Sequence, residues 1–179
     1  MSSADTLKAE AIGHFQQGRH REALAAFEAA AQAYQKADQP LDQAEMLNNI
    51  GVLQRLRREY DAAITAFATA VATFDAAGDQ NRQAQVLGNM GDLHANRKQR
   101  VEAIRCYSDA AELFAQTGDH ERQSQVLRAA SLLNVRQMRW LEALLYMEQS
   151  LNAHPRLGLG QRIFRSLIRF MMALMARGG

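Results

Sequence analysis

The sequence lacks several features that would point to a fold or an activity at once. Its 179 residues contain one cysteine, Cys106, and two prolines. A single cysteine excludes an intramolecular disulfide and fits a reducing compartment. Two prolines leave long stretches free to be helical, and long β-branched runs that would favour strands are absent. The composition therefore favours an all-α protein.

Segments that would target or anchor the chain in a membrane are also missing. The first residues are polar and acidic, so no signal peptide is recognised. The longest apolar stretch, near the C-terminus, is interrupted by Arg165 and Arg169 where a spanning helix would meet the bilayer core. The sequence therefore predicts a cytoplasmic protein.

Charge is distributed unevenly between the body of the chain and its tail. The formal net charge is +2, but every acidic residue lies at or before Glu148 and five arginines follow it. The body is therefore slightly acidic, while the tail carries positive charge alone. This balance gives no case for nucleic acid, and it makes the tail a candidate for acidic partners or anionic lipid.

Self-similarity with a period of 40 residues is the clearest pattern in the chain. It divides residues 4–155 into four repeats, at about 4–43, 44–83, 84–123 and 124–160. Equivalent positions carry similar side chains: Leu7, Leu47, Leu87 and Leu127; Ala23, Ala63, Ala103 and Ala143; Phe27, Phe67, Tyr107 and Met147. Since the matches fall at packing positions, the repeat is structural.

Each repeat contains two stretches with helical periodicity, which we call helix A and helix B. Leu87, Met90, Gly91 and His94 share one face of the first, and Ile104, Tyr107, Ala111 and Phe114 share one face of the second. The Gly-Asp pairs at 78–79 and 118–119 predict a glycine stop followed by an N-cap. The fold class expected is an all-α solenoid of helix–turn–helix repeats.

These residues resemble the tetratricopeptide repeat family. The small residue of its helix A is matched by Gly51 and Gly91, the alanine of its helix B by Ala63 and Ala103, and the following aromatic by Phe67 and Tyr107. The 40-residue period and the segments "LNNIG" and "LGNMG" are similar to the long repeats of kinesin light chains and of adaptors that bind GoLoco peptides. The resemblance implies a right-handed α-solenoid that binds partner proteins in a concave groove.

No constellation of residues indicates catalysis, a cofactor or a metal. His14 and His94 fall at the same repeat position on the packing face of helix A, which is a structural place rather than a metal site. Cys106 has no base at a recurring spacing, so an inert thiol is expected. Phosphate-binding glycine motifs are absent. The expectation is a protein that is not an enzyme and has no cofactor.

A second, more polar face of helix A is the candidate binding groove. Its residues are Asn48, Asn49, Val52, Arg55, Gln85, Asn89, Asp92, Asn96, Arg128 and Arg136. In the resembled family Asn49 and Asn89 would hold an extended peptide backbone, because an amide both donates and accepts hydrogen bonds. The alternative is that they bond a neighbouring helix end. The arginines favour an acidic peptide.

The tail, residues 161–177, is predicted to form a basic amphipathic capping helix. In the register of the repeat, Leu167, Met171 and Leu174 would pack on the last helix B. That packing leaves a tail interaction face of Phe164, Ile168, Met172 and Met175. Its covering is left open between a second copy in a homo-oligomer, a partner protein and a membrane surface.

Two functional hypotheses follow. The first is a non-catalytic adaptor or assembly factor that holds a peptide or helix of a partner in the groove. The alternative is a peripheral membrane scaffold anchored by the tail.

Overall fold

The computed structural model describes residues 3–154 and 157–177, and the side chains of residues 175–177 lie outside the description. All regular structure in these ranges is α-helical. The helices are α1 (Ser3–Gln16), α2 (His20–Lys36), α3 (Pro40–Leu56), α4 (Tyr60–Ala76), α5 (Gln80–Asn96), α6 (Arg100–Gln116), α7 (His120–Arg136), α8 (Trp140–Ala153) and α9 (Leu159–Arg177). The predicted all-α solenoid class is confirmed. Among the residues that the structure describes, no helix is both long and apolar enough to cross a membrane.

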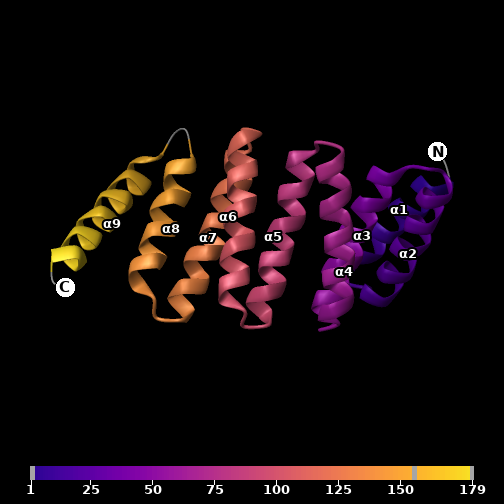
Figure 1. The fold of residues 1–179 in the computed structure, drawn as a ribbon, viewed down its shortest axis with the longest axis horizontal. Coiled ribbons are helices and arrows are strands. Elements are labelled where there is room, and N and C mark those ends of the chain that lie inside the picture. The colour runs from indigo at the N-terminus through magenta and orange to yellow at the C-terminus, as the bar shows by residue number, and fades with distance from the viewer. Residues whose placement is uncertain (1–2, 155–156, 178–179) are drawn as a thin grey trace. The chain divides into compact units, whose positions relative to one another are not determined.

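The chain forms two compact units, Met1–Leu93 and His94–Gly179. In the first unit, α1 pairs with α2 and α3 pairs with α4 (Figure 1). Aromatic side chains from helix B fill the space between helices, and Tyr34, Phe67 and Phe74 are fully buried. Alanines beside them, among them Ala30 and Ala70, have no exposed surface. This alternation of large and small side chains allows close packing.

The second unit is built in the same way around α6, α7 and α8. Its core includes Ala103, Tyr107, Ala130 and Leu133. At Ser131, where the second and third repeats have glycine, the hydroxyl group donates a hydrogen bond to the backbone carbonyl of Ala143, 2.7 Å away on α8. A buried polar side chain is tolerated here because it has a partner.

Turns between helices recur at a fixed interval. One residue in the left-handed region lies two positions after the last residue of each helix from α1 to α7: Gly18, Asp38, Arg58, Gly78, Lys98, Gly118 and Met138. The predicted glycine stops at Gly78 and Gly118 are confirmed, with φ of 69° and 73°. The predicted N-caps are confirmed as well, because Asp79 and Asp119 accept hydrogen bonds from the backbone N–H groups of Arg82 and Arg122. At four turns a residue other than glycine takes this conformation.

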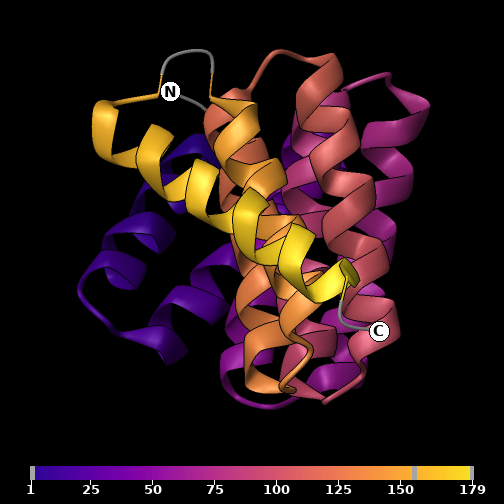
Figure 2. The same ribbon diagram turned by 90° about the vertical axis from the view of Figure 1, so that its left-hand side faces the viewer.

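The last helix, α9, crosses α8 obliquely (Figures 1 and 2). Ile168 is the side chain that it buries, with 1% of its surface exposed. The expectation that Leu167, Met171 and Leu174 pack on α8 is wrong, because all three are exposed. Polar contacts between α8 and α9 account for the orientation of α9 about its own axis. Arg165 donates to Asn152 and Arg169 to Glu148, which turns Ile168 inward.

Candidate binding surfaces

In the first compact unit, side chains of neighbouring A helices are linked by polar contacts. Lys8 Nζ on α1 lies 2.8 Å from the Glu45 carboxylate on α3. Asn89 Nδ2 on α5 donates to Asn48 Oδ1 on α3 at 2.8 Å. The second contact brings together two predicted groove residues, Asn48 on α3 and Asn89 on α5. We call the face around Asn49, Val52 and Arg55 the helix A surface.

The two asparagines at equivalent repeat positions, Asn49 and Asn89, have different surroundings. Asn89 bonds Asn48, which is only 4% exposed, so this amide pair joins two helices inside the protein. Asn49 is half-buried, and its side chain has no hydrogen bond among the described residues. Asn89 therefore links two helices. The peptide-binding role expected of Asn49 and Asn89 stays a prediction.

Arg55 is the most unusual charged group of the helix A surface. Its side chain is 17% exposed, and Nη2 lies 3.8 Å from Oδ2 of Asp92. Its Nε is buried without a hydrogen-bond partner. A buried donor without an acceptor costs on the order of 1–3 kcal/mol. An acceptor supplied from outside the described residues would recover part of that cost.

The other predicted groove residues are more exposed. Val52 is half-buried beside Asn49 on α3, and Gln85 is exposed on α5. Asn96, Arg128 and Arg136 belong to the second compact unit and are exposed there.

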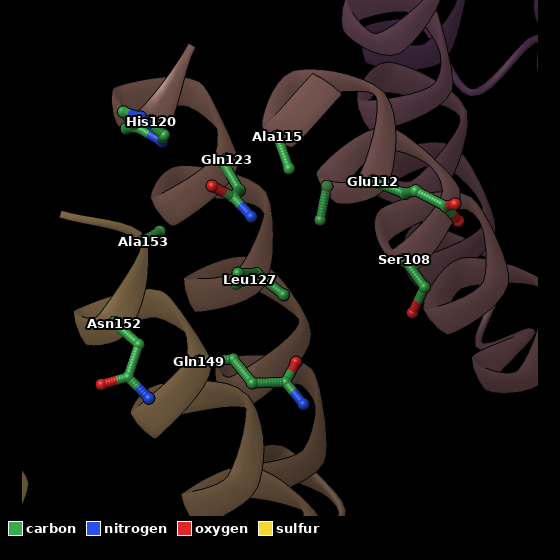
Figure 3. Close-up of a pocket in the computed structure, with 10 residues that line it drawn as sticks. Ser108, Glu112, Ala115, His120, Gln123, Leu127, Gln149, Asn152 and Ala153 are labelled. Atoms are coloured by element: carbon green, nitrogen blue, oxygen red, sulfur yellow. The ribbon is translucent and has the colours of Figure 1, made fainter. Parts of the chain in front are cut away.

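Two clefts each lie between the B helices of neighbouring repeats, and the sequence did not predict them. One, of about 590 Å³, opens between α2 and α4 above α3, and the other, of about 560 Å³, opens between α6 and α8 above α7 (Figure 3). Leu47 lines the first and Leu127 lines the second, and these residues are equivalent in the repeat. The clefts therefore follow from repeat packing, and the period of the small helix B residues was the signal for them.

The cleft of the second unit is lined by polar and apolar side chains, and Glu112 is an acidic group among them. The side chains that line it include Ser108, Glu112, His120, Gln123, Gln149 and Asn152 (Figure 3). Asn152 also accepts a hydrogen bond from Arg165 of α9 at 3.0 Å. Residues 3–154 and 157–177, as far as their side chains are described, contain no group of three or more His, Cys, Asp or Glu that could hold a metal ion. The lining offers hydrogen-bonding groups and little that would drive chemistry.

Two titratable groups are held neutral by burial. Burial raises the pKa of the Cys106 thiol, which keeps it protonated at neutral pH. Burial and the hydrogen bond to Asp5 raise the pKa of Tyr34 to about 12. Neither environment resembles that of an activated nucleophile.

Paired antiparallel helices with recurring small and aromatic positions define a helical-repeat protein of the tetratricopeptide-like class. A sequence model of the soluble NSF attachment protein family, SNAP, matches residues 2–153. The chain belongs to this family. The matched segment spans all the paired helices, so the family assignment concerns the repeat array and stops before α9.

The fold also has a counterpart among solved structures. The chain is similar to the crystal structure of BtubC (BKLC) from P. vanneervenii, with a TM-score of 0.73 and 16% sequence identity. The alignment covers 87% of this chain and 67% of that one. No curated protein matches the sequence.

These comparisons confirm a tetratricopeptide-like repeat fold. They do not test the finer likeness to kinesin light chains and GoLoco-binding adaptors, which stays a prediction. Repeat families of this kind are generally non-catalytic and interact with other proteins.

Proposed function

We propose that the chain is a non-catalytic adaptor or assembly factor that binds a peptide or helix of a partner protein on the helix A surface. The observation that carries the proposal is the buried, unpartnered Nε of Arg55. It lies on the same helix as the half-buried Asn49 amide and Val52. Together they provide a cation, an apolar contact and a backbone-bonding group.

The chemistry of these residues selects an acidic ligand. Asn49 can donate to a peptide carbonyl and accept from a peptide N–H, so it holds an extended backbone without reading its sequence. Arg55 pairs with carboxylates in a charge-assisted and often bidentate manner. Its 3.8 Å approach to Asp92 is longer than a hydrogen bond, so a ligand carboxylate can compete for the guanidinium group.

Selection of peptides on the purified chain tests this proposal. A random peptide library displayed on phage should yield acidic sequences, and their affinities can then be measured for designed variants by fluorescence anisotropy. Arg55→Ala should weaken binding at least about tenfold, which corresponds to a lost charge-assisted hydrogen bond. Asn49→Ala should weaken it less.

Two variants serve as matched controls. Arg57→Ala removes an exposed arginine that pairs with Glu59 in the turn after α3. Gln32→Ala removes an amide that lines the cleft between α2 and α4. Both should bind the selected peptides as the wild type does. Loss of binding in Gln32→Ala with full binding in Arg55→Ala would move the site to the cleft and reject the helix A surface.

A peripheral membrane scaffold is the second candidate, favoured by the exposed apolar side chains of α9. Against it, Arg165 and Arg169 are engaged by α8, which leaves fewer cations for lipid headgroups. For the proposed adaptor, we also propose a cytoplasmic location.

A further inference from the structure

Among the described residues, the outer face of α9 is an extended apolar surface that no other helix covers. Seven large side chains on this one helix are between 42% and 74% exposed: Leu159, Ile163, Phe164, Leu167, Phe170, Met171 and Leu174. At ~100° per residue they fall within an arc of about 140°. Gly160 is the only other residue in this arc whose side-chain environment is described. We call these seven residues the α9 outer face.

The predicted tail interaction face differs from this outer face. Phe164 belongs to both, but Ile168 is buried against the rest of the unit and Met172 is half-buried beside it. Met175 lies outside the residues whose side chains are described. The exposed apolar face of α9 therefore lies on a different side of the helix from the predicted one. It includes Leu167 and Phe170 and excludes Ile168.

The size of the outer face points to a protein interface. Seven roughly half-exposed large side chains present on the order of 100 Å² each, so about 700 Å² in all, close to the ~800 Å² per partner of a standard interface. The largest apolar patch of a typical monomer measures about 300–600 Å². Without a partner, an apolar face of this extent would stay exposed to water.

The charge pattern of α9 distinguishes between three candidates that could cover the outer face: anionic lipid, a charged partner segment and a second copy of the chain. The described arginines of α9 lie outside the arc, and two of them point to α8: Arg165 bonds Asn152, and Arg169 pairs with Glu148. The seven side chains of the α9 outer face are themselves uncharged. Anionic lipid needs cations beside the apolar face, and a charged partner segment needs a complementary charge. A second copy of the same neutral face needs neither.

We infer that α9 mediates a homodimer, in which the α9 outer faces of two copies pack on each other about a two-fold axis. A two-fold interface requires a patch that complements itself, and an uncharged row of Leu, Phe, Ile and Met side chains meets that requirement. Leu167 and Phe170 are near the middle of the row and form the centre of the contact. This inference goes beyond peptide binding on the helix A surface and does not depend on it.

Dimerisation would have a consequence for binding. Each copy carries one helix A surface around Asn49 and Arg55, so the dimer presents two. A partner with two acidic segments would then bind with an effective concentration advantage, without any new contact.

The mass of the purified full chain in solution tests the inference. Light scattering after size exclusion should give about twice the 20.0 kDa of one chain. Leu167→Glu with Phe170→Glu places charge at the centre of the face and should reduce the mass to one chain while leaving the helical circular dichroism unchanged. The control Ser166→Glu with Ala173→Glu adds the same charge on the arginine side of α9 and should stay dimeric.

A second measurement avoids any effect of charge on folding. In a Cys106→Ala background, Leu167→Cys should form a disulfide between two copies under mild oxidation, whereas Ala173→Cys should not. A wild-type chain that is monomeric at all concentrations overturns the inference. So does a charged double variant that remains dimeric. Flotation of the monomer with vesicles of phosphatidylserine and phosphatidylcholine would instead assign the face to lipid.

Discussion

Gly51 on α3 lies directly against the ring of Phe67 on α4. A Cβ atom added at Gly51 would stand 2.7 Å from Cε1 of that ring, closer than real Cβ contacts occur. Phe67 is fully buried and cannot move away without disturbing its neighbours. In the second repeat, the small residue of helix A and the aromatic residue of helix B, 16 positions apart, therefore pack as a pair.

Replacing Gly51 by alanine should destabilise the protein by about 1–3 kcal/mol, because the added methyl group overpacks the contact with Phe67. Urea unfolding followed by circular dichroism measures this change. The matched control is Gly13→Ala in α1, where an added Cβ meets no atom within 4 Å. That change should stabilise by roughly 0.5–1 kcal/mol through backbone entropy. Equal effects at both positions would contradict the packing argument.

Left-handed residues at the helix ends give a second prediction. Met138 and Arg58 have φ of 57° and 64° without being glycine, and both side chains are exposed. Met138→Gly and Arg58→Gly should each raise stability by about 0.5–1 kcal/mol, because glycine takes this conformation without a Cβ clash. Thermal unfolding monitored by calorimetry would show higher midpoints.

The converse substitution is the control. Gly118 has a φ of 73° and open space around its Cα, so Gly118→Ala tests backbone conformation alone. It should lower stability by about 1 kcal/mol. A neutral result there would remove the basis for both stabilising variants.

Tyr34 should make stability fall in strongly alkaline solution. Its hydroxyl donates to Asp5 at 2.9 Å, and its pKa is raised from 10.0 to about 12. Because the folded pKa exceeds the unfolded one, the contribution is complete below about pH 10 and is lost as pH rises to about 12, at up to roughly 1.4 kcal/mol per pH unit.

Tyr34→Phe isolates this effect. The stability difference between wild type and variant should shrink across that pH window, since other titrating groups affect both proteins equally. Tyrosinate absorbance should show one late-titrating tyrosine in the wild type that the variant lacks. A pH-independent difference would mean that burial does not hold this proton.

Cys106 should react slowly with iodoacetamide in the folded protein. It is 4% exposed and its thiol pKa is raised by burial, so little thiolate is accessible at neutral pH. Labelling followed by mass spectrometry should show an increase of at least about tenfold in denaturant. In a Cys106→Ala background, Val101→Cys, at an exposed position of α6, should react fast in both conditions.

The repeat was predictable because its signal is local. Leu7, Leu47, Leu87 and Leu127 are equivalent positions with the same demand for an apolar side chain, and periodicity shows such demands directly. The glycine turns at Gly78 and Gly118 were predictable for the same reason. Met138 gave no such signal, since nothing in a methionine indicates a left-handed backbone; only its place 20 residues after Gly118 does.

Side-chain pairing between helices was harder to predict. The period aligns Asn49 with Asn89, but neighbouring A helices meet with an offset, so Asn89 reaches Asn48. At α9 the period favoured Leu167 as the packed residue. The contacts of Arg165 and Arg169 with Asn152 and Glu148 instead set the rotation that buries Ile168. These contacts occur only between α8 and α9 among the described helices, so the repeat pattern of the sequence could not predict them.

The polar links between neighbouring A helices close short stretches of chain. Lys8 and Glu45 are separated by 37 residues, and Asn48 and Asn89 by 41. Loops of this size cost little entropy to close, and nearest-neighbour contacts let each repeat form on a preceding one. The array should therefore fold quickly and fray from its ends. Hydrogen exchange should be slowest at the buried centres of α3 and α4, and fastest in α9.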